Sequence, residues 1–101
     1  MRLQFSIDEV VVGEEERSQI LKKFSTLDKY LTHVAPDLQR GTLRIVYGKR
    51  WGYQVKVVVS IPGYEAVAET EDKSLLTAID QVVDKLSVEL SKRHILKGYA
   101  H

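Results

Sequence analysis

The chain has 101 residues, with 15 basic and 14 acidic side chains, a formal net charge of +1 and no cysteine. This length fits one domain that buries a core without covalent cross-links, and the nearly balanced charge gives no general attraction to nucleic acid. The lack of cysteine excludes a disulfide framework, a thiolate nucleophile and a cysteine-based zinc site. We therefore expect one domain over residues 1–101, in which any nucleic-acid binding depends on how the charges are distributed.

The N-terminal residues alternate apolar and polar side chains, which is typical of a strand with one buried face. The apolar members are Leu3, Phe5 and Ile7. This start lacks the continuous apolar stretch of a signal peptide, and no segment approaches membrane-spanning length. The sequence therefore predicts a soluble, cytoplasmic protein without a membrane partner.

After Gly13 the spacing of apolar residues becomes helical. Apolar side chains recur at intervals of four, three, four and three, at Ile20, Phe24, Leu27, Leu31 and Val34. Glutamates at positions 14 to 16 occupy the predicted first turn, where negative charge complements the helix dipole. The pattern predicts one helix that continues until Pro36.

The middle of the chain predicts three consecutive strands, which span Thr42 to Tyr47, Tyr53 to Ile61 and Tyr64 to Glu71. A loop over residues 48–52 joins the first two. Pro62-Gly63 supplies a tight turn, because proline presets the first central position of a type II turn and glycine accepts the positive φ of the second.

These two connections also predict the register of the sheet. Pairing across the Pro62-Gly63 turn places Lys56 opposite Glu69, on the face away from the helices, and the preceding loop brings Arg44 beside Lys56. Inward-facing tyrosines at the strand ends are interpreted as covers of the core and not as a platform for stacked bases. They are Tyr47, Tyr53 and Tyr64.

The last third of the chain predicts a long amphipathic helix from Ser74 to Lys97, with a tail that frays from about residue 98. Its apolar positions share one face and are Leu75, Ile79, Val82, Val83, Leu86 and Leu90. Small side chains at Ala66 and Ala68 on the preceding strand would let this helix approach the sheet closely.

The predicted order of elements is β-α-β-β-β-α, an α+β fold built on a four-stranded mixed sheet. The first two strands are joined through a helix and should be parallel, whereas strands two, three and four should form an antiparallel meander. Both helices should pack on one face of the sheet.

Several fragments, taken in order, connect this pattern to a known family. They are Lys22-Lys23-Phe24 and Lys29-Tyr30 in the first helix, Ile61-Pro62-Gly63 after the third strand, and Ala78-Ile79-Asp80 and Val83-Asp84-Lys85-Leu86 in the second helix. Over nearly its whole length the chain resembles the short ribosome hibernation factors, the ribosome-associated inhibitor family once called sigma-54 modulation proteins.

This resemblance implies a fold similar to a double-stranded RNA-binding domain, with no enzymatic activity and no cofactor. It also implies binding to the small ribosomal subunit and its ribosomal RNA, in the channel used by messenger and transfer RNA, which silences translation under stress. Cations on the exposed helix faces and at the hairpin tip would contact phosphates, because shape-based recognition of RNA needs positive charge at backbone spacing. The predicted contacts are Lys22, Lys29, Lys49, Arg50, Lys85 and Lys92, with His33 and Arg93 beside them.

Other interpretations of the same residues stay open. The cations could form an ordinary solvated surface, or the chain could be a double-stranded RNA binder unrelated to ribosomes. It could also be a protein-interaction module with weakened RNA binding, because Val88 stands where the family has a basic residue. Val88 and Ile95, two turns apart on the solvent face, would then contact a partner protein or a second copy.

Two smaller features complete the sequence analysis. Trp51, at the hairpin tip, either stacks on RNA or folds back over the sheet edge. The three histidines, His33, His94 and His101, have no metal-ligand spacing, so we expect no metal site.

Overall fold

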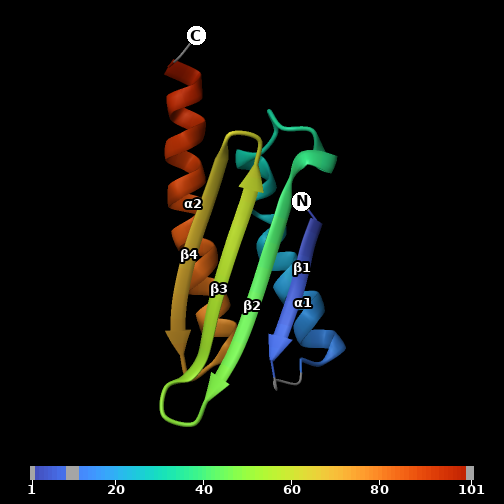
Figure 1. The fold of residues 1–101 in the computed structure, drawn as a ribbon, viewed down its shortest axis with the longest axis vertical. Coiled ribbons are helices and arrows are strands. Elements are labelled where there is room, and N and C mark those ends of the chain that lie inside the picture. The colour runs from blue at the N-terminus through green and yellow to red at the C-terminus, as the bar shows by residue number, and fades with distance from the viewer. Residues whose placement is uncertain (1, 9–11, 100–101) are drawn as a thin grey trace.

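The computed structural model describes residues 2–8 and 12–99, with side chains described for residues 3–5 and 12–92. Its elements are β1 (Arg2–Asp8), α1 (Glu14–Ser25), β2 (Arg40–Gly48), β3 (Gly52–Ile61), β4 (Tyr64–Asp72) and α2 (Leu75–Tyr99), with two short 3-10 helices, η1 (Asp28–Tyr30) and η2 (Pro36–Leu38), between α1 and β2. Both α-helices lie on the same face of the sheet (Figure 1). The predicted β-α-β-β-β-α fold is confirmed. The last two residues lie outside the described part, so the frayed tail stays a prediction.

The sheet has the strand order β1-β2-β3-β4, with β1 parallel to β2 and the other neighbours antiparallel. Lys56 pairs with Glu69 across β3 and β4, and Arg44 pairs with Lys56 across β2 and β3, as predicted. Gly63 has a φ of +79°, the conformation that the predicted turn requires of its glycine. The register therefore follows from the two connections, and it leaves β4 as an edge strand.

The core fills the space between the sheet and the helices. Every apolar position predicted for the α2 stripe is buried, and so are Ala66 and Ala68 on β4. The hydroxyl of Thr70, itself buried, donates to the Ala78 carbonyl oxygen at 2.7 Å and so joins β4 to α2. These contacts fix the long helix across the back of the sheet, with its other face exposed.

The prediction that one helix continues to Val34 is wrong, because α1 ends at Ser25. The Ser25 hydroxyl donates to the Lys22 carbonyl oxygen at 2.6 Å, and the Thr26 hydroxyl donates to the Lys23 carbonyl oxygen at 2.7 Å. Hydroxyls placed in this way compete for the carbonyl groups that a continuing helix would use. The chain therefore leaves the helix at this pair.

After α1 the backbone continues in tighter turns of the 3-10 type. The Leu27 amide donates to the Phe24 carbonyl oxygen at 3.0 Å, a bond three residues back where an α-helix bonds four back. Leu27 and Leu31 are nonetheless fully buried, which is why their spacing imitates a longer helix. The buried Gln39 holds the loop that follows, since its side-chain amide donates to the carbonyl oxygens of Leu31 at 3.0 Å and Val34 at 2.8 Å.

One of the three inward tyrosines is misplaced by the prediction. Tyr53 and Tyr64 pack against the core, but Tyr47 is 50% exposed. The β2–β3 hairpin projects past the start of α2 (Figure 1), so no helix covers the end of β2. Tyr47 instead lies against Tyr53, with 5.0 Å between the ring centroids.

Candidate nucleic-acid interface

The first group of predicted phosphate contacts begins on α1. Ile20 and Phe24 direct one side of α1 into the core, which leaves Lys22 exposed on the other side. A shallow hollow of about 340 Å³ lies between α1 and α2, lined by Gln19, Lys22, Lys23, Thr26 and Leu76. Lys22 therefore stands at the rim of a depression that an RNA backbone could follow.

Lys23, beside Lys22, has a different role, which the sequence did not reveal. Its ammonium nitrogen lies 2.6 Å from a carboxylate oxygen of Asp80 on α2. The two residues are 57 positions apart in the chain, so no local pattern identifies the pair. This ion pair links the two helices along the hollow and makes Lys23 less available for a phosphate.

Lys29 and His33 extend this group beyond the end of α1, and both are exposed. The Lys29 ammonium lies 5.1 Å from the centroid of the Tyr30 ring, within cation–π range. Tyr30 is half-buried and packs against the core, so it is a weaker candidate for RNA contact than its neighbour. Lys29 belongs to η1, and α2 packs against η1, so Lys29 lies where these two helices meet.

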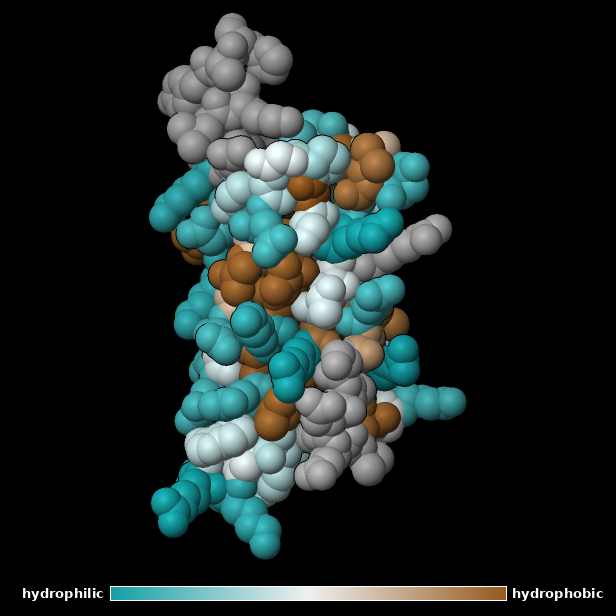
Figure 2. All heavy atoms as spheres, in the orientation of Figure 1, coloured by the Kyte–Doolittle hydropathy of each residue, from teal (hydrophilic) through white to brown (hydrophobic). Residues whose placement is uncertain are grey.

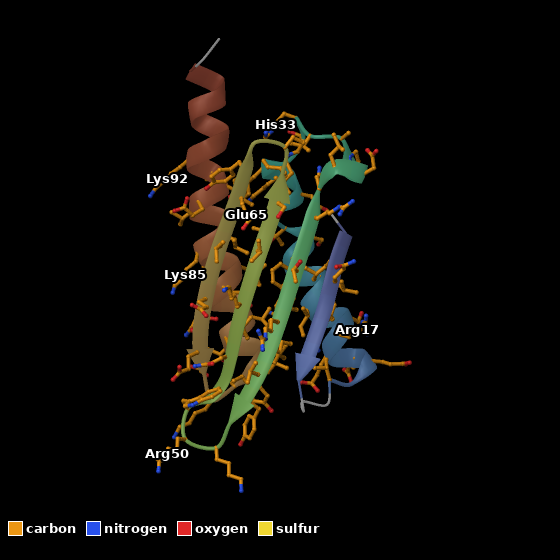
Figure 3. All side chains as sticks on the ribbon, in the orientation of Figure 1. Arg17, His33, Arg50, Glu65, Lys85 and Lys92 are labelled. Atoms are coloured by element: carbon orange, nitrogen blue, oxygen red, sulfur yellow. The ribbon has the colours of Figure 1, made fainter. Side chains whose placement is uncertain are left out.

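Lys85 and Lys92 lie two helical turns apart on α2 and project from the flank beside β4 (Figure 3). Both are exposed. The Lys85 ammonium donates to the main-chain carbonyl oxygen of Glu69 on β4 at 2.9 Å. Lys85, a predicted phosphate contact on the exposed face of the helix, therefore reaches toward the sheet edge.

Lys49 and Arg50 are exposed at the tip of the β2–β3 hairpin, at the opposite end of the molecule from His33 (Figure 3). The ring of Trp51 lies against Gly48, where an added Cβ would meet its carbon atoms at 2.3 Å. Of the two interpretations of Trp51, the structure therefore has the ring folded back onto the sheet.

The predicted cations thus form three groups and not one continuous face. Lys22, Lys29 and His33 follow the helix layer, Lys85 and Lys92 lie on the flank of α2, and Lys49 and Arg50 lie at the hairpin tip. The molecule measures 49 × 23 × 19 Å along its principal axes, so the hairpin group is remote from the end that carries His33. The side chains of Arg93 and Ile95 lie outside the described residues, as does His101.

Within residues 2–8 and 12–99 no cluster of histidine, cysteine, aspartate or glutamate is arranged to hold a metal ion. In the same part of the chain, no helix combines the length and the apolar character needed to cross a membrane.

Comparisons with known proteins show which family the chain matches and which solved structures share its fold. The family model described as sigma 54 modulation protein / S30EA ribosomal protein matches residues 3–95. The Thermus thermophilus Protein Y N-terminal domain superposes with a TM-score of 0.76 at 22% identity, covering 91% of this chain and 98% of that one. A ribosomal subunit interface protein from Coxiella burnetii gives a TM-score of 0.73 at 22% identity, covering 92% and 97%. No curated protein is a significant match in sequence.

Proposed function

Because the chain belongs to the sigma 54 modulation protein / S30EA ribosomal protein family, which the sequence resemblance had predicted, we propose that it binds the ribosome and silences translation. The family is not one of enzymes, so the protein acts by occupying a site and not by making or breaking bonds. The proposed site is the channel for messenger and transfer RNA on the small subunit, in the cytoplasm of stressed or resting cells. There the protein would contact ribosomal RNA and exclude messenger RNA and transfer RNA.

The observation that carries this proposal is a pair of exposed lysines on the helix layer, Lys22 and Lys29, with the exposed His33 farther along the chain. Lys22 borders an open hollow between α1 and α2, and both helices pack on the core. Phosphate contacts from a rigid surface position a protein on RNA without reading its sequence. Lys92, Lys49 and Arg50 would add contacts at the two ends.

The proposal is tested by sedimenting the purified protein with isolated small and large subunits. We expect cosedimentation with the small subunit, and competition from messenger RNA and transfer RNA bound beforehand. Lys22→Glu combined with Lys29→Glu should remove most of the binding at moderate salt. The matched control is Arg40→Glu combined with Lys73→Glu, which makes the same change in net charge at exposed positions outside α1, η1 and α2.

Circular dichroism of each variant separates loss of binding from loss of folding. If the variant with Lys22→Glu and Lys29→Glu is folded and sediments like the control, the proposal of phosphate contact through this surface is wrong. If binding survives full occupancy of the channel by messenger and transfer RNA, the location in the channel is wrong.

A second candidate function is protein interaction through the same fold. The observation that favours it is Val88, which is 56% exposed on α2. Val67 on β4 is 50% exposed, and the two valines line one hollow. Val88→Glu should leave the core intact and change self-association or partner binding, which sedimentation velocity and pull-down experiments measure. Unchanged profiles in both would remove this candidate.

A further inference from the structure

The outer edge of β4 presents main-chain groups that β3 does not use. No strand lies beyond β4 in the described part of the chain. The bond from Lys85 to the Glu69 carbonyl oxygen shows that the main chain of Glu69 faces outward. Since the direction of N–H and C=O groups alternates along a strand, the main chains of Glu65, Val67 and Glu71 face outward as well.

A groove follows this edge between β4 and α2. It consists of two adjoining hollows of about 540 Å³ and 310 Å³, which share Glu69 and Lys85 in their walls. The larger hollow contains the exposed side chains of Val67 and Val88. In Figure 2 a small apolar patch over β3 and β4 is surrounded by hydrophilic surface. Val67 lies on the open face of the sheet, which is the face away from the helices, and pairs there with the half-buried Val58.

Links between β4 and α2 hold the walls of the groove in place. The Tyr64 hydroxyl donates to a carboxylate oxygen of Glu89 at 3.0 Å at one end of β4. Toward the other end, the buried Thr70 hydroxyl donates to the Ala78 carbonyl oxygen at 2.7 Å. The groove is therefore a feature of the packed fold, and a ligand would find it formed.

The charge around the groove is negative. Its walls contain the carboxylates of Glu69, Glu71 and Glu89 and one ammonium, that of Lys85. Glu65 adds a further carboxylate on the same face of β4 (Figure 3). Lys56 and Arg44 lie beside Glu69 toward the middle of the sheet, but at the β4 edge carboxylates outnumber ammonium groups, which disfavours phosphate there.

The same charges oppose pairing with a second copy of the chain. An antiparallel pair of β4 strands centred on Val67 would set Glu65 opposite Glu69 of the other copy. Centring the pair on Ala68 would set Glu65 opposite Glu71. Like charges directly opposite one another destabilise a strand pair, and natural edge strands are protected in this way.

We infer that the β4 edge binds an extended basic segment of another protein, which adds to the sheet as a further strand. Basic side chains at alternate positions of the segment would face the glutamates of β4, and an apolar side chain would fill the hollow at Val67 and Val88. Main-chain bonds supply affinity in this mode of recognition, and the alternating pockets supply specificity. The inference deepens the second candidate function, because it names the class of partner for the hollow at Val67 and Val88, and it does not depend on ribosome binding.

Lys85 covers this edge in the absence of a ligand. Its ammonium occupies the Glu69 carbonyl oxygen that an added strand would need, and lysine is a common protector of exposed strand edges. A bound segment must displace it. Lys85→Met keeps most of the aliphatic stem while removing both the competing bond and a repelling charge, so this variant should bind a basic segment more tightly.

The test uses a short synthetic peptide of alternating lysine and valine, blocked at both ends. Amide hydrogen exchange followed by NMR distinguishes strand addition from simple charge attraction. In the free protein the outward amides of Glu65, Val67, Glu69 and Glu71 should exchange quickly, and the peptide should slow their exchange. A peptide of the same sequence in which every interior residue is N-methylated carries the same charge but lacks the main-chain donors on both of its edges, so it should give no such protection.

Affinity is then compared between two charge-reversed proteins by fluorescence anisotropy with labelled peptide. Glu69→Lys combined with Glu71→Lys should weaken binding roughly tenfold or more at low salt. The matched control, Glu14→Lys combined with Glu15→Lys, changes the charge equally at exposed positions on α1 and should bind nearly as well as the native protein.

Three results would overturn the inference. The first is equal affinity of the two variants, and the second is equal protection of the β4 amides by the N-methylated peptide. The third is protection of the same amides by an RNA oligonucleotide, which would assign the groove to nucleic acid.

Discussion

Replacing Gln39 by leucine should reduce the free energy of unfolding by about 2 kcal/mol. The side chain is 6% exposed and donates two hydrogen bonds, to the carbonyl oxygens of Leu31 at 3.0 Å and Val34 at 2.8 Å. Leucine fits a buried site but donates neither bond, and each bond contributes about 1 kcal/mol net. The Leu31 carbonyl oxygen still accepts from the Val34 amide at 3.0 Å, so no large additional penalty arises at that group.

Urea denaturation followed by circular dichroism measures this loss. With an m-value of about 1 to 1.5 kcal/mol/M, the midpoint should fall by roughly 1.5 M. Gln39→Glu is the matched comparison, because it keeps the shape but presents carboxylate oxygens to two carbonyl oxygens. It should cost more than the leucine variant. A loss below about 0.5 kcal/mol for leucine, or a glutamate variant as stable as the native protein, would refute the assigned role of Gln39.

The remaining predictions concern backbone strain, the interhelical ion pair and salt. Gly52→Ala should lower stability by about 3 kcal/mol or more, because Gly52 has a φ of +83° and an added Cβ would lie 2.6 Å from the Asp72 carbonyl oxygen. Gly63→Ala, at a φ of +79° with open space around it, should cost only about 1 to 2 kcal/mol, and urea denaturation measures both losses. Asp80→Asn should cost less than about 1 kcal/mol, since the paired side chains of Lys23 and Asp80 are 33% and 57% exposed; a larger loss would contradict a screened surface ion pair. If three lysines neutralise phosphates, affinity for the small subunit should fall with a log–log salt slope of about 2.7, roughly fortyfold between about 50 and 200 mM, and a flat profile would exclude phosphate contact.

The sheet was predictable because each of its constraints is local. Alternation has a period of two residues, and a one-residue shift would expose the buried valines of β3, so the turn at Pro62-Gly63 was enough to set Lys56 opposite Glu69. The end of α1 was mispredicted although its cause is also local. The Ser25 and Thr26 hydroxyls compete for helix carbonyls, but the buried leucines beyond them keep a helical spacing and hide that signal.

The candidate interface was less predictable than the fold. Exposure of Lys22, Lys29 and Lys92 follows from the position of each on its own element, and the sequence identified it. The group that a long side chain contacts depends on the tertiary fold. Lys85 reaches a carbonyl group 16 residues earlier in the chain, and Lys23 pairs with a carboxylate 57 residues later. Neither contact leaves a periodic signal, so the division of the cations into three groups could not be read from the sequence.

Within a net charge of +1, one group of lysines and one group of glutamates lie on different layers of the fold. Lys22 and Lys29 stand on the helix layer, whereas Glu65, Glu69 and Glu71 stand on the open face beside the β4 edge, with the core between the two layers. At physiological salt, interactions between exposed charges fade over about 8 Å, a distance shorter than any dimension of this 49 × 23 × 19 Å molecule. Each surface therefore acts on a ligand mainly through its own charge. An anionic ligand on the helices and a cationic segment on β4 can bind at the same time, and charge reversal on one surface should leave affinity at the other nearly unchanged.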